Sequence, residues 1–184
     1  GSGKSTLINV VSGHYRADAG SVVFDGREIA GIPAHRIARL GLARTYQIPR
    51  PFAHLTVRDN VALNAMFGGE QLAPDDARRA ADEWLAFTGL ASRAEALPGD
   101  LNLHQTKFLE LARALASRPR LVLLDEVLSG LTPAEIDDAV ALIRRIRDRG
   151  TTIVLVEHVM RVVTALADRV VVLDQGRVLA EGAF

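Results

Sequence analysis

Two short, unbroken runs of aliphatic residues constrain the fold of this chain most strongly. Leu121–Leu124 and Ile153–Val156 contain only Leu, Ile and Val. Such runs are typical of parallel strands buried on both faces, which requires helices on both sides of the sheet. A helix signal lies between them, because Thr132, Pro133 and Glu135 form an N-cap, a first-turn proline and a capping-box glutamate. The sequence therefore predicts an α/β fold with a mainly parallel sheet.

Turn residues predict a small antiparallel portion in addition to this sheet. Residues 21–29 carry Asp25-Gly26 between two short strand-like runs, the pattern of a tight β-hairpin. A second strand pair is expected at 169–173 and 178–180. Further helices are expected at residues 7–11, 33–40, 107–116 and 132–148, and a further strand at 41–46.

The middle of the chain has a different character. Residues 56–90 are rich in alanine with helical periodicity, contain Trp84, and end before the loop at 97–100. This pattern predicts a small helical subdomain inserted into the sheet-containing domain.

Composition excludes several classes of function. The chain has 22 Lys+Arg and 22 Asp+Glu residues, so it lacks the basic excess that nucleic acids or anionic membranes attract. It has no Cys, which excludes disulfides, a thiolate zinc site and a Cys nucleophile. We find no signal peptide and no apolar run near about 18 residues, and therefore expect a cytoplasmic protein. Four histidines lack metal-ligand spacing: His14, His35, His54 and His104.

The segment that opens the chain matches the second half of a phosphate-binding P-loop: Gly1, Ser2, Gly3, Lys4, Ser5 and Thr6. Glycines let backbone N–H groups turn towards a polyphosphate, and the following helix adds its positive N-terminus. In such a loop Lys4 reaches the β- and γ-phosphates, and Ser5 holds Mg²⁺. A glycine-rich turn with a chance lysine is the alternative.

Two carboxylates, Asp125 and Glu126, directly follow the first aliphatic run. The carboxyl end of a parallel strand is where such sheets bind ligands, and adjacent buried charges cost free energy unless they bind something. Asp125 can bind Mg²⁺ through water, and Glu126 can accept a proton from an attacking water. An acidic pair that merely caps a turn is the alternative, which the presence of Lys4 and Ser5 disfavours.

In the order of its motifs, the chain resembles the nucleotide-binding subunits of ABC transporters over essentially its whole length. A glutamine follows a predicted strand, a signature-like segment precedes the acidic pair, and a histidine follows the next strand. Three segments resemble the branch that energises uptake of branched-chain amino acids, with relatives serving amides or urea: Gly41–Gln47, Asp125–Leu131 and Val156–Met160. The resemblance implies a P-loop NTPase-type sheet, ATP hydrolysis, and ATP and Mg²⁺ as ligands.

The resemblance also implies roles for individual residues. Gln47 would sense the γ-phosphate and bind Mg²⁺ together with Ser5 and Asp125. Glu126 would be the catalytic base, and His158 would contact the γ-phosphate and hold Glu126 and the water. Viewed alone, Gln47 is equally a polar strand end and His158 an ordinary polar group. We expect one domain over residues 1–184, with a nucleotide-binding core at 1–47 and 101–184 and the helical subdomain at 48–100.

The signature segment departs from the family's Leu-Ser-Gly-Gly-Gln pattern. It would face the ATP bound to the opposite subunit, and its residues are Leu101, Asn102, Leu103, His104 and Gln105. Side chains at Leu103 and His104 replace both glycines, so a loop that has lost its nucleotide role is the alternative. Thr132 also stands where many family members have Asp, which is expected to alter communication between the two ATP sites.

Partners follow from the resemblance and not from composition. We expect a second nucleotide-binding subunit, identical or related, and permease subunits contacted through residues 47–67, at the cytoplasmic face of the cell membrane. An extracytoplasmic solute-binding protein would take part indirectly, and no nucleic acid is expected. The alternatives are lipid or lipopolysaccharide export, an ABC ATPase acting on ribosomes or DNA, and a catalytically weak partner subunit. The sequence does not name the solute.

The ends of the chain suggest an internal segment of a longer protein, because it begins in a loop without Met and stops after a strand-like run. A processed or naturally short chain is the alternative. The resemblance implies an upstream strand and an adenine-stacking aromatic residue before Gly1, so we expect the chain alone to bind ATP poorly.

Overall fold

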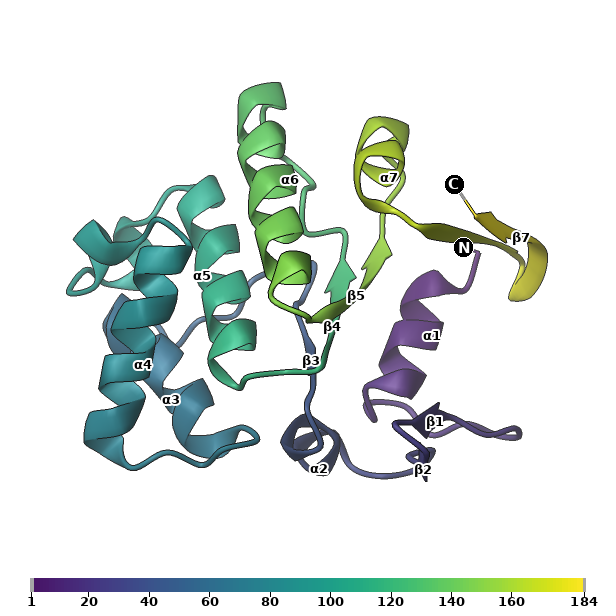
Figure 1. The fold of residues 1–184 in the computed structure, drawn as a ribbon, viewed down its shortest axis with the longest axis horizontal. Helices are drawn as coiled ribbons and strands as arrows, with labels where there is room; N and C mark the ends of the chain where they lie inside the picture. Colours follow the sequence, from purple (N-terminus) through teal and green to yellow (C-terminus); the bar gives the residue numbers. More distant parts are fainter. Residues whose placement is uncertain (1, 184) are drawn as a thin grey trace.

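The computed structural model describes residues 2–183, whose strands form three sheets. The largest has the order β3-β4-β5, with β3 at Leu42–Arg44, β4 at Leu121–Asp125 and β5 at Thr152–Val156. Both strand pairs are parallel, and β4 lies in the middle (Figure 1). The predicted α/β class with a mainly parallel sheet is confirmed.

Alternate residues of β4 enter two different hydrophobic clusters. Leu123 packs with Ile8 of α1 (Lys4–Val11) on one side of the sheet. Val122 and Leu124 pack on the other side with the helices drawn left of the sheet in Figure 1. Because successive strand residues point to opposite faces, both of which are covered, every position of this run must be aliphatic.

Strand β5 is less buried than its aliphatic sequence predicts. Val154 pairs in register with Leu123, so the two side chains lie on the same face of the sheet. Leu123 is only 2% exposed, whereas Val154 is 41% exposed. Helix α1 thus covers the central strand and leaves β5 partly open on that face. The expectation of burial on both faces is correct for β4 and wrong for β5.

The two antiparallel pairs form as predicted. β1 (Val23–Phe24) pairs with β2 (Arg27–Glu28) around a turn in which Asp25 and Gly26 have φ angles of 49° and 73°. β6 (Arg169–Asp174) pairs with β7 (Arg177–Ala183), a longer ribbon than the sequence indicated. A left-handed turn again needs glycine, here Gly176 with φ 78°.

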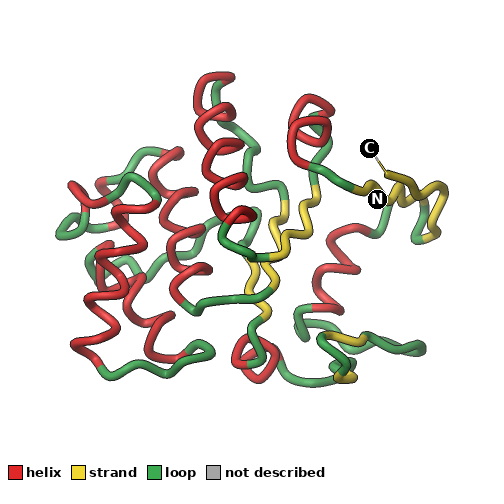
Figure 2. The backbone as a smooth tube through the Cα atoms, viewed as in Figure 1, coloured by secondary structure: helices red, strands yellow, loops and turns green. Residues whose placement is uncertain are grey.

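The middle of the chain forms helices, as its periodicity predicts. α3 (Val57–Phe67) and α4 (Pro74–Phe87) pack against α5 (Leu103–Ala116) at the end of the molecule furthest from β6 and β7 (Figure 2). The 3₁₀ turns at Ala91–Arg93 and Pro98–Asp100 connect α4 to α5. Alanines with at most 1% exposure let the helices approach closely: Ala65, Ala77 and Ala81. The proposed division into 1–47 plus 101–184 and 48–100 stays a prediction.

Helix boundaries differ from the sequence-based expectation in informative ways. α2 (Ala34–Arg39) has Pro33 as its N-cap instead of inside its first turn. α6 (Pro133–Asp148) begins with the predicted Thr132–Glu135 capping box. α7 (Met160–Leu166), whose Val162 is fully buried, was not predicted. Within residues 2–183, no helix has the length and apolarity needed to cross a membrane.

Candidate active site

The carboxyl edge of the parallel sheet brings together the predicted catalytic residues. Gln47 Nε2 donates a hydrogen bond of 2.8 Å to Glu126 Oε2. On the other side, His158 Nδ1 lies 4.0 Å from Glu126 Oε1. These residues follow β3, β4 and β5 respectively, and parallel strands present their carboxyl ends at one edge. Glu126 therefore lies between Gln47 and His158.

The backbone of Glu126 is strained in a way that places its side chain at this edge. Its φ angle is 48°, in the left-handed region that a residue with a Cβ adopts at a cost of about 1–3 kcal/mol. Two hydrogen bonds hold it there: Glu126 N donates to Val156 O at 3.0 Å, and Ser129 N donates to Glu126 O at 3.1 Å. The chain thus turns sharply after β4, and strain of this kind is concentrated at functional sites.

Asp125 occupies a more buried position than Glu126. It is 5% exposed, and Arg44 Nη2 lies 3.6 Å from its Oδ2. Burial raises the pKa of Asp125, and the positive charge of Arg44 opposes that rise.

Glu157 is a half-buried acid that the sequence did not identify as a site residue. Leu128 N donates to its Oε1 at 3.3 Å, which links the end of β5 to the loop after Glu126. Burial raises the pKa of Glu157, and that hydrogen bond opposes the rise. Its position at the carboxyl end of an aliphatic run, next to His158, is the signal that could have found it.

The P-loop residues lie at the start of α1, and Gly1 lies outside the described residues. Gly3 is the N-cap with φ 91°, and no side chain caps the helix, so its first N–H groups can bind an anion. Lys4 Nζ donates to Ser2 Oγ. Ser5 and Thr6 are exposed.

Oxygen donors at this edge suit a magnesium ion bound with a nucleotide. Mg²⁺ prefers one or two protein oxygens together with phosphates and waters, and it does not need a full protein cage. Ser5, in the first turn of α1, supplies a hydroxyl and Asp125, at the end of β4, a carboxylate, and α1 packs against β4 through Ile8 and Leu123. Among residues 2–183, no three His, Cys, Asp or Glu side chains are grouped as a metal site of their own.

The signature segment forms the beginning of a helix instead of a loop. α5 starts at Leu103, four residues before the predicted start at Lys107. Asn102 is its N-cap: Asn102 Oδ1 accepts from Gln105 N at 2.8 Å, and Gln105 Oε1 accepts from Asn102 N at 3.2 Å. The prediction of the start was wrong because Asn and Gln three residues apart form a capping box.

The two residues that replace the family's glycines lie differently. Leu103 is 49% exposed and packs closely against Gly130. A Cβ added at Gly130 would lie 3.1 Å from Leu103 Cδ2. His104 lies against Phe108, with ring centroids 4.1 Å apart, and its buried Nε2 has no hydrogen-bond partner among the described residues. Leu103 is therefore the more accessible of the two.

Asn102→Ala is expected to destabilise the protein by about 1 kcal/mol, because the N-terminus of α5 would lose its side-chain cap. Urea unfolding measures this loss. Asn102→Ser keeps an N-cap oxygen and serves as the control. Equal stability of the alanine and serine variants would contradict a capping role and leave Asn102 free for the signature role.

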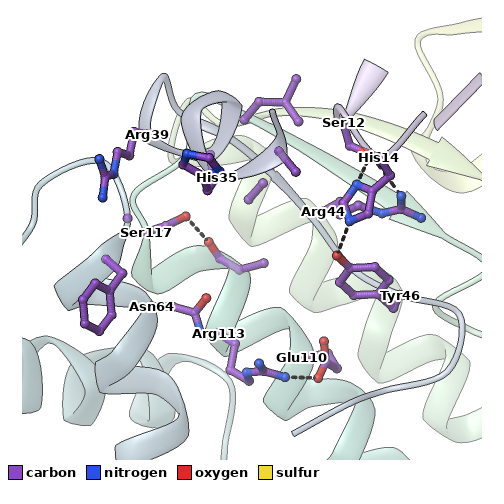
Figure 3. A pocket seen from close by; sticks show the side chains of 17 residues that line it. Ser12, His14, His35, Arg39, Arg44, Tyr46, Asn64, Glu110, Arg113 and Ser117 are labelled. Carbon is purple, nitrogen blue, oxygen red and sulfur yellow. Dashed lines mark hydrogen bonds and ion pairs between the residues drawn. The ribbon is translucent and has the colours of Figure 1, made fainter. Parts of the chain in front are cut away.

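A cleft of about 580 Å³ lies between α2, β3, α3 and α5, and none of Gln47, Glu126 and His158 lines it. Its charged side chains are three arginines and one acid (Figure 3): Arg39, Arg44 and Arg113, with Glu110 bonded to Arg113. His14 and His35 also line the cleft, and burial and the nearby Arg44 lower the pKa of His14, which favours its neutral form. Because its arginines outnumber its one carboxylate, the cleft is suited to an acidic group.

Comparison with known proteins agrees with this geometry. The family model described as ABC transporter matches residues 1–129. The high-affinity branched-chain amino acid transport ATP-binding protein BraF of Pseudomonas aeruginosa is 37% identical over 196 residues, covering 99% of this chain and 77% of BraF. The methionine import ATP-binding protein MetN of Rhizobium etli is 41% identical over 187 residues, covering 99% of this chain and 51% of MetN.

Solved structures show the same fold. The ADP conformation of an ATP-binding cassette of an ABC transporter is 28% identical, with a TM-score of 0.87 over 100% of this chain and 76% of that one. Together with the family match and the 37% identity to BraF, this likeness means that the chain belongs to the ABC transporter family and is one of its ATP-hydrolysing subunits.

Proposed function

We propose that this ATPase powers the uptake of branched-chain amino acids or related small amides. The similarity to BraF over 99% of the chain supports this class of solute. The single observation that carries the chemistry is the position of Glu126 between Gln47 and His158 at the end of β4. Methionine import is the second candidate, because MetN is 41% identical.

In this proposal the residues at this edge have separate roles in ATP hydrolysis. Lys4 and the free N–H groups at the start of α1 would bind the β- and γ-phosphates. Glu126 would accept a proton from the attacking water, while His158 would contact the γ-phosphate and hold the water near Glu126. Gln47 would leave Glu126 and turn towards the γ-phosphate when ATP binds, which frees the base.

Magnesium fits this arrangement, with Ser5, Asp125 and Gln47 as the residues that would hold it beside the phosphates. When bound, Mg²⁺ neutralises charge that develops on the β- and γ-phosphates. Asp125 contributes the carboxylate, and the adjacent Arg44 favours its ionised form.

A permease and a second nucleotide-binding subunit would complete the machine at the cytoplasmic face of the membrane. Leu101–Gln105 would face the ATP of the opposite subunit, with the N-terminus of α5 directed at its phosphate. The cleft would receive an acidic segment of the permease, because its arginines outnumber its one carboxylate. Tyr46 in the lining of the cleft directly precedes Gln47. Motion at the γ-phosphate would thereby reach the cleft. An extracytoplasmic binding protein would deliver the solute.

Uptake of labelled amino acids tests the solute class. Cells that lack this protein are expected to lose leucine uptake and retain methionine uptake. Complementation with the wild-type full-length protein restores leucine uptake, and complementation with Glu126→Gln does not, because transport requires hydrolysis. Loss of methionine uptake alone would reject the proposal in favour of the second candidate.

A further inference from the structure

Arg44 is a buried cation whose contacts reach three separate parts of the fold. Its side chain is 9% exposed, although it lies at the end of β3 close to the site. Arg44 Nη1 donates to Asn9 Oδ1 at 2.7 Å and to Ser12 Oγ at 3.0 Å, while Arg44 Nη2 lies 3.6 Å from Asp125 Oδ2. One guanidinium therefore bridges α1 and the residues directly after it to the end of β4.

This bridge joins the two elements that contain the oxygen donors assigned to magnesium, Ser5 and Asp125. Asn9 lies in α1, the helix whose first turn contains Ser5. Asp125 ends β4. Since a helix moves as a rigid unit, fixing Asn9 relative to Asp125 also fixes Ser5 relative to Asp125.

Only arginine can make this set of contacts. Its planar guanidinium offers five N–H donors in a fixed fork, whereas lysine offers a single compact charge on a flexible stem. Ser12 is 4% exposed and the side chain of Asp125 is 7% exposed, so little water can replace a lost contact. Removing the guanidinium would leave the Asp125 carboxylate buried without its counter-charge.

Arg44 also contacts Tyr46, the residue directly before Gln47. The guanidinium carbon of Arg44 lies 4.7 Å from the centre of the Tyr46 ring, within cation–π range. Tyr46 OH is 2.8 Å from His14 Nε2, and Ser12 Oγ is 3.1 Å from His14 Nδ1 (Figure 3). Arg44 thus contacts both Asp125 and Tyr46, and His14 holds Tyr46 from its other end.

We propose that Arg44 is a positioning residue that sets the spacing between Ser5 and Asp125 for the metal by tying α1 to the end of β4. This inference rests on the proposed function, in which Ser5 and Asp125 hold Mg²⁺. In this role Arg44 acts through α1 and Asp125 and is not itself a ligand of the metal.

Metal binding tests the proposal without relying on turnover. Mn²⁺ is titrated by electron paramagnetic resonance into the full-length protein with a non-hydrolysable ATP analogue. Arg44→Met is expected to raise the Mn²⁺ concentration for half-saturation about 10-fold or more, the usual effect of losing a group that orients a metal ligand. Asn9→Ala is expected to raise it by a smaller factor, and to add nothing in the Arg44→Met background, because both changes break the same bridge.

Arg120→Met is the matched control. Arg120 is an exposed arginine that also makes an ion pair and a cation–π contact, with Asp25 and Phe24, away from the site. The Mn²⁺ concentration for half-saturation of Arg120→Met is expected to stay at the wild-type value. An equal shift in Arg120→Met and Arg44→Met would overturn the proposal, because loss of any arginine would then suffice.

The remaining outcomes separate this inference from the proposed function. Asp125→Asn must weaken Mn²⁺ binding if the metal assignment is correct. Weak binding in Asp125→Asn combined with wild-type binding in Arg44→Met overturns only the role of Arg44. Wild-type binding in Asp125→Asn overturns both. If Arg44→Met does not fold, Asn9→Ala decides: a raised half-saturation supports the bridge, and an unchanged one rejects it.

Discussion

Glu126→Gln is expected to reduce ATP hydrolysis by about 10³-fold, because a positioned general base contributes on the order of 10²- to 10⁴-fold. Glutamine keeps the shape of the side chain and can still pair with Gln47 and His158, but it cannot accept the proton of the attacking water. ATP binding is expected to persist, since the groups assigned to the phosphates are unchanged. Phosphate release under saturating Mg·ATP measures the loss.

Glu83→Gln is the control for this substitution, because Glu83 is exposed on α4, far from β4 in the fold (Figure 1). Undiminished hydrolysis in Glu126→Gln would remove Glu126 from the role of base. The Glu126→Gln variant also gives a second readout, its mass in solution with and without Mg·ATP. If Leu101–Gln105 acts as a working signature, Mg·ATP is expected to double the mass of Glu126→Gln. A Glu126→Gln monomer that binds ATP would assign the second site to another subunit.

Lys4→Met is expected to weaken ATP binding by about 10- to 100-fold, because a charge-assisted hydrogen bond contributes about 1.5–3 kcal/mol. Methionine keeps most of the aliphatic stem and removes the ammonium group. Among residues 2–183 that group bonds to Ser2 alone, a neighbour two residues away, so its loss is not expected to disturb the fold. Equilibrium titration with a fluorescent ATP analogue in the full-length protein gives the affinity.

Arg27→Met is a suitable comparison, because Arg27 is an exposed cation in the short strand β2. It is expected to bind the analogue like the wild type. If Lys4→Met also binds like the wild type, Lys4 does not reach the phosphates and the P-loop assignment fails.

Aliphatic patterning was sufficient to locate the central strand but not to rank the strands by burial. Leu121–Leu124 and Ile153–Val156 are almost equally apolar, yet only the first is covered throughout by helices on both sides. The difference arises from where α1 packs, and strand sequence carries no information about that. Likewise, α5 begins at Leu103 because Asn102 and Gln105 cap it, a local signal that the comparison with the family's glycine pattern obscured.

The sequence by itself determined the α/β class, the order of the motifs and the polar residues that follow each parallel strand. These features are local, since strand and helix periods and turn residues are written in neighbouring positions. Only the tertiary structure placed Gln47 and His158 around Glu126, and only it showed Arg44 linking α1 to Asp125. Arg44 and Asn9 are 35 positions apart, and their contact exists because α1 packs against the sheet. Spacing along a chain does not encode such proximity, because it depends on how whole elements pack.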